Sequence, residues 1–337
     1  MFASRPRFGV HVPLLVLVLL MARVAGHVLV ADACVEQESA ENSFLQTKSS
    51  SERKQAPPVA ECPLPVGARW CTANITGLAS FDMAVYAFND IVSSSICSQG
   101  HWETAEMESY GPAGSAVDIG ANVGFYTLAL ARAGWNVTAF EPLSSNIKLL
   151  SASLCRNPDL ASRITLHTVG LGPRPEHCTI ISRNANVGDG QVRCGPPVSA
   201  RVQGYESRGG FDLQRLDDVL AEQKLSRIDF LKIDVEGFEC EVLAGGPSVL
   251  SKYRPRLIQS EVWYDMENCA PAEYLAKFRK AKYVIAKEKT CEMPTMSVDR
   301  AIQDFWMCRE SKLSLLTEQV SPKVDSHMRG IVLLRAA

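Results

Sequence analysis

Hydrophobic and polar positions follow their clearest pattern between residues 116 and 141. The β-branched residues Val117 and Ile119 predict a short strand, and apolar residues at helical spacing predict a helix over 125–133 that ends at Gly134. A second strand is predicted over 137–140. A turn bracketed by glycines separates the first strand from the helix. The stretch therefore has the pattern of half a nucleotide-binding βαβ unit.

The rest of the chain continues this alternation. Helices are predicted over 144–154, 213–220, 238–244 and 271–280, and strands over 164–169, 228–233, 257–262, 283–286 and 304–308. Upstream, a strand over 81–88 and a helix-like patch over 101–107 precede the glycine turn. Regular alternation of strands with helices predicts an α/β fold with a doubly wound, mostly parallel sheet and helices on both faces.

The segment from residue 170 to residue 211 interrupts the alternation. It is rich in glycine, proline and arginine, and no clear helical spacing is present. Long segments of this kind are usually functional or inserted. We expect one or two hairpins closed by a bridge between Cys178 and Cys194, and we interpret the segment as a candidate part of an acceptor pocket.

Carboxylates gather where the predicted strands end, which is where a doubly wound sheet binds its ligands. These ends carry Asp118, Glu141, Asp234, Glu236 and Glu261. Glu141 follows the glycine turn by about twenty residues, where an acid can accept hydrogen bonds from both ribose hydroxyls. The glycines lack the spacing that lets backbone approach a pyrophosphate, so a phosphate-free nucleoside fits better than a dinucleotide.

S-adenosylmethionine is a nucleoside of this kind, with a sulfonium cation and a zwitterionic amino-acid tail. Its charge suits Asp118 and Glu141, and a helix that begins near Phe125 suits the carboxylate of its tail. The alternative is a buried structural turn in which Asp118 caps the loop.

Composition narrows the class of partner. The chain has 337 residues, of which 46% are hydrophobic, and this is ample for a packed core. The formal charge of −2 and the absence of a clustered positive stretch argue against nucleic acid. A small or neutral acceptor is expected.

The N-terminus predicts entry into the secretory pathway. Residues 1–33 resemble a signal peptide, because arginines precede an apolar run over 10–21 and a small-x-small cleavage site lies at 31–33. An uncleaved anchor, which would make a type II membrane protein, is the alternative. Residues 34–60 are expected to be a disordered stalk, and residues 61–337 a single domain with a core over about 97–308.

The eleven cysteines suit an oxidising compartment and show neither a C-x-x-C pair nor zinc spacing. We expect a free, buried thiol at Cys240 and bridges between cysteines close in sequence: Cys62 with Cys71, Cys178 with Cys194, and Cys291 with Cys308. Two glycosylation sequons begin at Asn74 and Asn136. The first is expected to be used if its loop is exposed, and the second, in a core strand, is expected to stay unmodified.

Several blocks of the sequence resemble the FkbM-type methyltransferases, a family of S-adenosylmethionine-dependent class I enzymes. The blocks are residues 117–127, 139–142, 216–220, 228–239, and 242–246 followed by 254–258. The pairing of the first block with the fourth is the specific part. The resemblance implies methyl transfer, usually to a hydroxyl oxygen on a sugar or another small metabolite.

The resemblance also implies a site, with Asp234 and Glu236 as catalytic residues beside the reacting methyl group. By matching positions, the cofactor-binding residues are Asp118, Gly120, Ala121, Asn122, Gly124, Phe125, Glu141, Pro142 and Asp234. Three roles stay open here: Asp234 or Glu236 acts as the general base, Asp234 only holds the amino group of the cofactor, or Asp234, Glu236 and Glu261 bind a divalent cation. No metal is assigned from the sequence.

Other residues have two interpretations each. Glu103, with Trp102, either lies over the cofactor or faces solvent, and Lys232 either snorkels to an edge or pairs with an acid. Trp263 and Tyr264 either line the acceptor site or pack in the core. Two other classes of function are considered: a binding protein that has lost turnover, and a nicotinamide-dependent oxidoreductase, which the glycine spacing disfavours.

Overall fold

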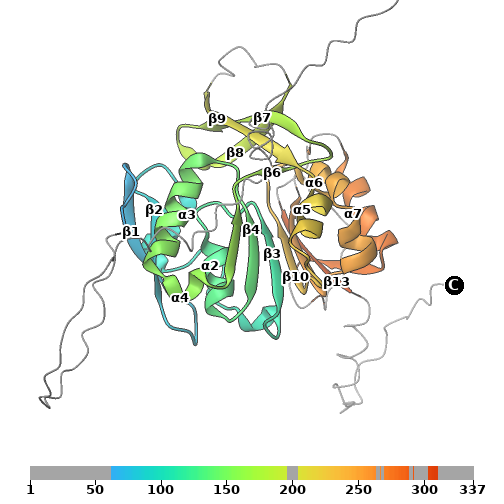
Figure 1. Ribbon diagram of the computed structural model, residues 1–337, viewed down its shortest axis with the longest axis horizontal. Coiled ribbons are helices and arrows are strands. Elements are labelled where there is room, and N and C mark those ends of the chain that lie inside the picture. The colour runs from blue at the N-terminus through green and yellow to red at the C-terminus, as the bar shows by residue number, and fades with distance from the viewer. Residues whose placement is uncertain are drawn as a thin grey trace, which may run out of the picture.

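A computed structural model of the chain describes residues 62–195, 204–262, 266, 269–287, 291 and 303–309. The predicted signal peptide and stalk, and the pair Trp263 and Tyr264, lie outside the described residues. A seven-stranded sheet with the order β12-β13-β11-β10-β3-β4-β5 forms the centre of the fold (Figure 1).

The central sheet is mostly parallel, as the alternation predicts. Five strands run parallel: β3 (Ser115–Ile119), β4 (Asn136–Phe140), β5 (Ile164–His167), β10 (Phe230–Ile233) and β11 (Leu257–Val262). Two more strands, β13 (Gln303–Arg309) and β12 (Tyr283–Ala286), complete one edge. Because β13 pairs antiparallel with both β11 and β12, β13 is reversed and β12 runs in the direction of the five parallel strands. The chain winds outward from β3 to β5 and then returns to β10 beside β3. The switch point of the sheet therefore lies between β3 and β10.

Helices cover both faces of this sheet (Figure 1). One face packs against α2 (Phe125–Arg132), α3 (Ser144–Arg156) and α4 (Pro158–Ala161), and the other against α5 (Leu216–Glu222), α6 (Glu239–Gly245) and α7 (Pro271–Lys280), with a π-helical turn at Val249–Tyr253. Neighbouring strand residues alternate between the two layers, so Ala116 belongs to the first core and Val117 to the second. The strands are accordingly buried on both sides.

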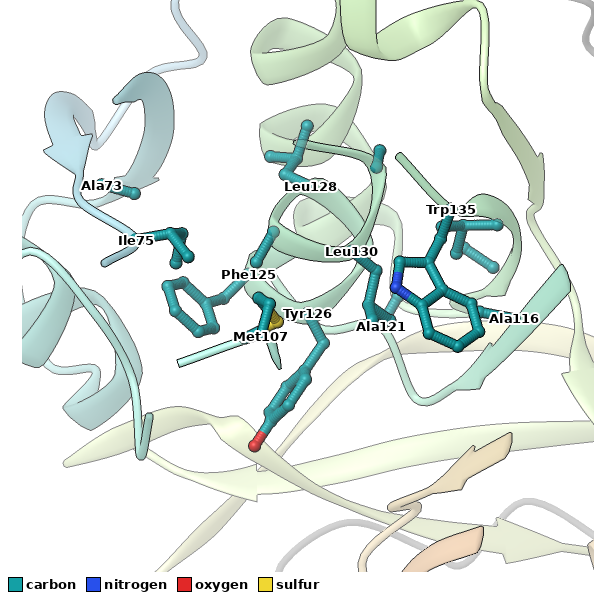
Figure 2. Packing of buried hydrophobic residues seen from close by; sticks show 14 of the residues in the cluster. Ala73, Ile75, Met107, Ala116, Ala121, Phe125, Tyr126, Leu128, Leu130 and Trp135 are labelled. Carbon is teal, nitrogen blue, oxygen red and sulfur yellow. The ribbon is translucent and has the colours of Figure 1, made fainter. Parts of the chain in front are cut away.

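Helix α2 is buried around its whole circumference. Phe125, Leu128 and Leu130 are at most 1% exposed, and Trp135 closes the cluster behind them (Figure 2). Each such side chain contributes about 1.5–3 kcal/mol through burial, so packing rather than helix propensity fixes the eight-residue helix that follows the glycine turn.

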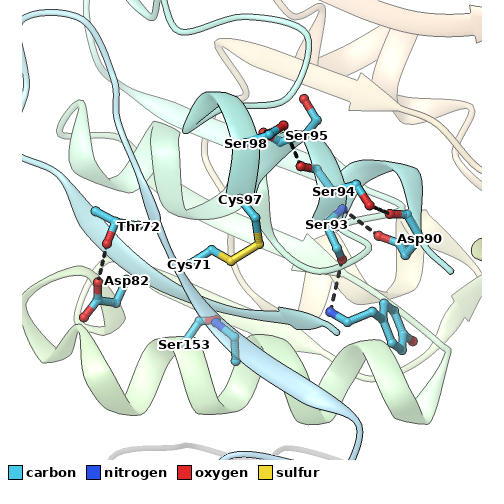
Figure 3. Close-up of a disulfide and its surroundings, with 12 residues drawn as sticks. Cys71, Thr72, Asp82, Asp90, Ser93, Ser94, Ser95, Cys97, Ser98 and Ser153 are labelled. Atoms are coloured by element: carbon cyan, nitrogen blue, oxygen red, sulfur yellow. Dashed lines mark hydrogen bonds between the residues drawn. A yellow bond between two sulfur atoms is a disulfide. The ribbon is translucent and has the colours of Figure 1, made fainter. Parts of the chain in front are cut away.

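An N-terminal unit packs against α3. It consists of the antiparallel strands β1 (Ala68–Ala73) and β2 (Phe81–Tyr86) and of helix α1 (Ile91–Gln99). Asp90 begins α1 by accepting a hydrogen bond from the Ser93 N–H at 2.7 Å (Figure 3). The helix-like patch over 101–107 is a wrong prediction. Its residues form bends and an isolated bridge, and a 3₁₀ turn follows at Glu108–Tyr110.

A second sheet, here called the roof sheet, lies over the carboxyl end of the central sheet (Figure 1). It has the order β6-β9-β7-β8 and comprises β6 (Gly170–Leu171), β7 (Glu176–Arg183), β8 (Asn186–Cys194) and β9 (Tyr205–Gln214). The expected hairpin and its bridge between Cys178 and Cys194 are confirmed. Because β9 continues to Gln214, the helix predicted over 213–220 begins only at Leu216.

The structure pairs ten of the eleven cysteines, and Cys34 lies outside the described residues. The predicted bridge between Cys291 and Cys308 is confirmed. The prediction for Cys62 and Cys71 is wrong, because Cys62 bonds Cys155 on α3 and Cys71 bonds Cys97 on α1 (Figure 3). The prediction of a free thiol at Cys240 is also wrong, since Cys240 bonds Cys269. These partners meet through tertiary packing that sequence distance does not show.

Two further predictions concern the surface and the membrane. Asn74 is exposed directly after β1, and Asn136 is exposed as the first residue of β4. The use of either sequon stays a prediction. Within the described part of the chain, every helix falls short of the length and apolar character that crossing a bilayer requires.

Candidate active site

A pocket lies at the switch point of the central sheet, beneath the roof sheet. The empty space within it is about 1100 Å³ when the solvent at its open mouth is included. The strand ends contribute Gly120, Glu141 and Asp234, and the roof sheet contributes residues such as Gly190 and Val192. The pocket therefore joins the most regular part of the sequence to its least regular part.

The turn after β3 has a backbone conformation that only glycine can adopt at position 120. Its φ of +83° is left-handed, and a Cβ atom there would lie 1.7 Å from the backbone oxygen of Asp234. Asn122 is also left-handed, with φ of 53°, and its side-chain oxygen accepts the Val123 N–H at 2.8 Å. Strained conformations of this kind collect at functional sites.

Glu141 holds this turn and also faces the pocket. One carboxylate oxygen accepts the Asn122 N–H at 2.7 Å, and the other accepts the Leu143 N–H at 2.8 Å and the Asn146 side-chain amide at 3.3 Å. The side chain is 4% exposed. Burial raises the pKa of Glu141 to about 7, although these hydrogen bonds act in the opposite direction.

Asp118 lies beneath the pocket instead of on its wall. It is fully buried, and a carboxylate oxygen accepts the Thr127 hydroxyl hydrogen bond at 2.6 Å. Burial raises the pKa of Asp118, and the nearby Lys232 cation opposes that rise. Asp118 therefore connects the end of β3 to α2, and its predicted contact with the cofactor stays a prediction. Gly124 is likewise not among the residues that line the pocket; it is the left-handed N-cap residue of α2.

The other sequence-predicted residues come together on the pocket wall. They are Gly120, Ala121, Asn122, Phe125, Glu141, Pro142, Asp234 and Glu236. They come from three segments, the turns after β3, β4 and β10, that are far apart in the sequence.

Lys232 forms an ion pair with Asp234, as one of its two interpretations expected. The ammonium nitrogen lies 2.7 Å from an Asp234 oxygen and 5.2 Å from the centre of the Tyr126 ring. Burial alone would lower the pKa of Lys232, but the carboxylates of Asp234 and Asp118 hold it above its ordinary value. One oxygen of Asp234 is therefore committed to a buried cation.

Three carboxylates meet at the far side of the pocket from Glu141. Oxygens of Asp234, Glu236 and Glu261 lie within 4.8 Å of one another. Hard oxygen ligands of this kind suit a divalent cation, but the Lys232 ammonium already supplies positive charge to Asp234. The arrangement can receive a proton or a cationic group.

Glu239 supports the loop that carries these acids, and sequence reasoning missed it. One of its carboxylate oxygens accepts the N–H groups of Val235 at 3.1 Å and Gly237 at 3.2 Å. The loop needs this support because Glu236 is left-handed, with φ of 56°. Burial raises the pKa of Glu239 to about 7. In the sequence, the position of Glu239 three residues after Glu236 could have indicated this supporting role.

Glu103 and Trp102 line the pocket, and Glu103 is also exposed to solvent, so the structure agrees with both interpretations of Glu103. The Tyr126 hydroxyl donates a 2.6 Å hydrogen bond to a carboxylate oxygen of Glu103. The side-chain amide of Gln259 donates to the same hydroxyl at 3.4 Å. Tyr126 was missed from the sequence, although it comes two residues after Gly124.

Comparison with known families matches this region of the chain. The model for the methyltransferase FkbM domain matches residues 118–285, which include the glycine turn, Glu141, the roof sheet and the acidic loop. Residues 118–285 of the chain therefore form a methyltransferase FkbM domain. The doubly wound and mostly parallel sheet confirms the predicted α/β fold.

Two curated fungal proteins are similar over part of their length. Methyltransferase sdnD of Sordaria araneosa is 32% identical over 152 residues, which are 38% of this chain and 59% of that protein. Methyltransferase 1 of Beauveria bassiana (strain ARSEF 2860) is 30% identical over 146 residues, which are 38% of this chain and 57% of that protein. The chain thus matches less than two thirds of either relative.

Solved structures show partial similarity. The FkbM methyltransferase from Methylobacillus flagellatus KT is 21% identical, with a TM-score of 0.38 over 58% of this chain and 44% of that one. The O-methyltransferase from Bacillus cereus in complex with SAH is 15% identical, with a TM-score of 0.35 over 59% of this chain and 75% of that one.

Proposed function

We propose that this chain is an S-adenosylmethionine-dependent methyltransferase that acts on a hydroxyl oxygen of a carbohydrate or another small metabolite. The observation that carries the proposal is the position of Glu141 and the Gly120 turn on one wall of a pocket, at the switch point of a sheet within the family-matched region. The fold alone would not support this proposal, because one fold can serve many functions.

The residues on this wall fit the donor. Gly120 lets the loop after β10 approach the turn, because a Cβ atom there would lie 1.7 Å from the backbone oxygen of Asp234. Glu141 offers carboxylate oxygens to ribose hydroxyls. The first turn of α2 presents N–H groups that no side chain caps, and these suit the carboxylate of the tail. Bound here, S-adenosylmethionine would supply an electrophilic methyl group.

The acidic loop supplies the base that an alcohol acceptor needs. Transfer to a hydroxyl requires removal of its proton, and a carboxylate within hydrogen-bond reach can take it. The Lys232 ammonium already offsets the charge of Asp234, so we assign the proton to a carboxylate oxygen of Glu236, which also lines the pocket. Asp234 then acts in positioning, and orientation of the two reactants supplies much of the acceleration.

The cellular place proposed for this activity is the secretory pathway, either as a secreted protein or in the lumen of the endoplasmic reticulum or Golgi. Five disulfides support an oxidising compartment, and the predicted signal peptide points the same way. If the N-terminal segment stays uncleaved, the protein is a type II membrane protein with the same lumenal domain. Glycan hydroxyls are the acceptors that such a compartment offers.

Methyl transfer is tested directly with the full chain and S-adenosylmethionine carrying a labelled methyl group. The acceptors are a panel of neutral monosaccharides, oligosaccharides and glycans, and the product is identified by mass spectrometry as a methyl ether. Glu236→Gln is the matched variant, since it keeps the shape of the side chain and removes the base. Label in an ether that the variant does not form supports the proposal. Donor binding without transfer to any acceptor would favour the binding-protein alternative instead.

A further inference from the structure

We propose that Glu103 binds the α-ammonium group of the donor's amino-acid tail. The inference rests on the proposed function, because it assigns one contact within the same pocket. It concerns a residue upstream of the matched region 118–285. Glu103 belongs to the segment that joins the N-terminal unit to β3.

The position of Glu103 follows from its contacts. Its carboxylate accepts from Tyr126, which lies in the first turn of α2, and Tyr126 also accepts from Gln259 on β11. Glu103 is thus on the β10 and β11 side of the Gly120 turn, whereas Glu141 is on the β4 side. A donor whose ribose is held by Glu141 extends across the turn, and its tail ends at Glu103.

Charge decides which end of the tail Glu103 receives. Among the described residues that line the pocket, Lys232 carries the positive charge, and it is 4% exposed and bonded to Asp234. The tail carboxylate therefore goes to the N–H groups at the start of α2, which is eight residues long. The ammonium then lies next to the first turn of that helix, where Tyr126 holds Glu103.

Tyr126 fixes Glu103 as a hydrogen-bond acceptor. Burial raises the pKa of Tyr126 well above its ordinary value, so the hydroxyl keeps its proton and donates to Glu103. The backbone of Glu103 is left-handed, with φ of 52°, a strained conformation of the kind that collects at functional sites. The carboxylate can accept from an ammonium group with its second oxygen.

Two ligands distinguish binding of the amino-acid tail from binding of the rest of the donor. S-adenosylhomocysteine has the α-ammonium group, and 5′-methylthioadenosine has the same nucleoside and sulfur without the amino acid. The Glu103→Gln variant keeps the bond from Tyr126 and loses the charge. Calorimetric titration of the full chain should show that this variant binds S-adenosylhomocysteine about 10- to 100-fold more weakly. Its affinity for 5′-methylthioadenosine should equal that of the wild type.

Two further variants sharpen the result. Glu106→Gln, at an exposed acid in the same segment that does not line the pocket, should bind both ligands as the wild type does. Tyr126→Phe should weaken the binding of S-adenosylhomocysteine but not of 5′-methylthioadenosine. Its effect should be smaller than that of Glu103→Gln, because the Glu103 carboxylate keeps its charge and loses only the hydrogen bond from Tyr126. Wild-type affinity of Glu103→Gln for S-adenosylhomocysteine, or an equal loss of both ligands, would overturn the assignment. A folded wild type that binds neither ligand would overturn the proposed function itself.

Discussion

Substituting alanine for Gly120 tests whether the close contact between β3 and β10 builds the pocket. The added Cβ atom would lie 1.7 Å from the Asp234 backbone oxygen, whereas real Cβ contacts shorter than 3.0 Å are essentially never seen. The neighbouring atom belongs to the backbone, so rotation of a side chain cannot relieve the clash. The two strand ends must separate instead.

The expected loss of stability has two parts. A left-handed φ of +83° costs a non-glycine residue about 1–2 kcal/mol. Separating the strand ends also breaks the 3.0 Å bond from the Asp234 N–H to the Ile119 oxygen, which leaves buried backbone groups unpaired at about 1–3 kcal/mol. We expect Gly120→Ala to lose about 2–5 kcal/mol in total, which lowers Tm by roughly 4–20 °C.

Gly134→Ala is the matched control, because its φ of +92° is also left-handed but its added Cβ meets nothing closer than 3.6 Å. It should lose only the about 1–2 kcal/mol of backbone strain, or roughly 2–8 °C in Tm, and bind S-adenosylhomocysteine normally. Thermal unfolding and calorimetry of the two full-length variants measure both effects. Equal stability of the two variants, or normal ligand binding by Gly120→Ala, would refute the reasoning.

Three other perturbations follow from the site. Raising the pH from about 6 to about 8 should strengthen S-adenosylhomocysteine binding severalfold, because Glu141, with its pKa raised to about 7, becomes a charged acceptor. The same ionisation lowers the stability of the unliganded protein: the contribution of Glu141 is complete below the unfolded pKa of 4.5 and is lost as the pH rises through about 7. An affinity for S-adenosylhomocysteine that does not change between about pH 6 and about pH 8 would contradict the binding prediction. Lys232→Met should lower the unfolding free energy by about 2–3 kcal/mol, less than for a fully buried pair because Asp234 is partly exposed. Chemical denaturation measures it, and adding Asp234→Asn should restore part of the loss. Replacing Cys178 and Cys194 by alanine should cost about 3 kcal/mol and weaken S-adenosylhomocysteine binding, because β8 forms part of the pocket wall. Unchanged affinity in this variant would show that the roof sheet does not shape the donor site.

The central sheet was predictable because its signals are local. Val117, Ile119 and the glycine turn mark a strand and a helix within a few residues, and the same holds for the strand that ends at Asp234. The acids at strand ends could be gathered into one site because parallel strands share an edge. That rule places Glu141 and Asp234 together without any knowledge of side-chain contacts.

What escaped prediction depends on contacts between distant segments. Nothing near Cys62 in the sequence indicates that α3 will carry its partner Cys155, and nothing near Cys240 indicates Cys269. Asp118 shows the same limit at the site. Its position at a strand end suggested the wall, but the alternation of strand side chains and the bond from Thr127 place it beneath.

Binding of S-adenosylhomocysteine to the full chain tests the central claim most directly, with Glu141→Gln as the variant. The account predicts that the wild type binds the ligand saturably at one site per chain. The affinity of the variant should be lower by about tenfold or more, because charged hydrogen bonds to the ribose are lost. Both proteins should unfold cooperatively, which shows that they are folded. Folded wild-type protein that binds neither S-adenosylhomocysteine nor S-adenosylmethionine would contradict the account.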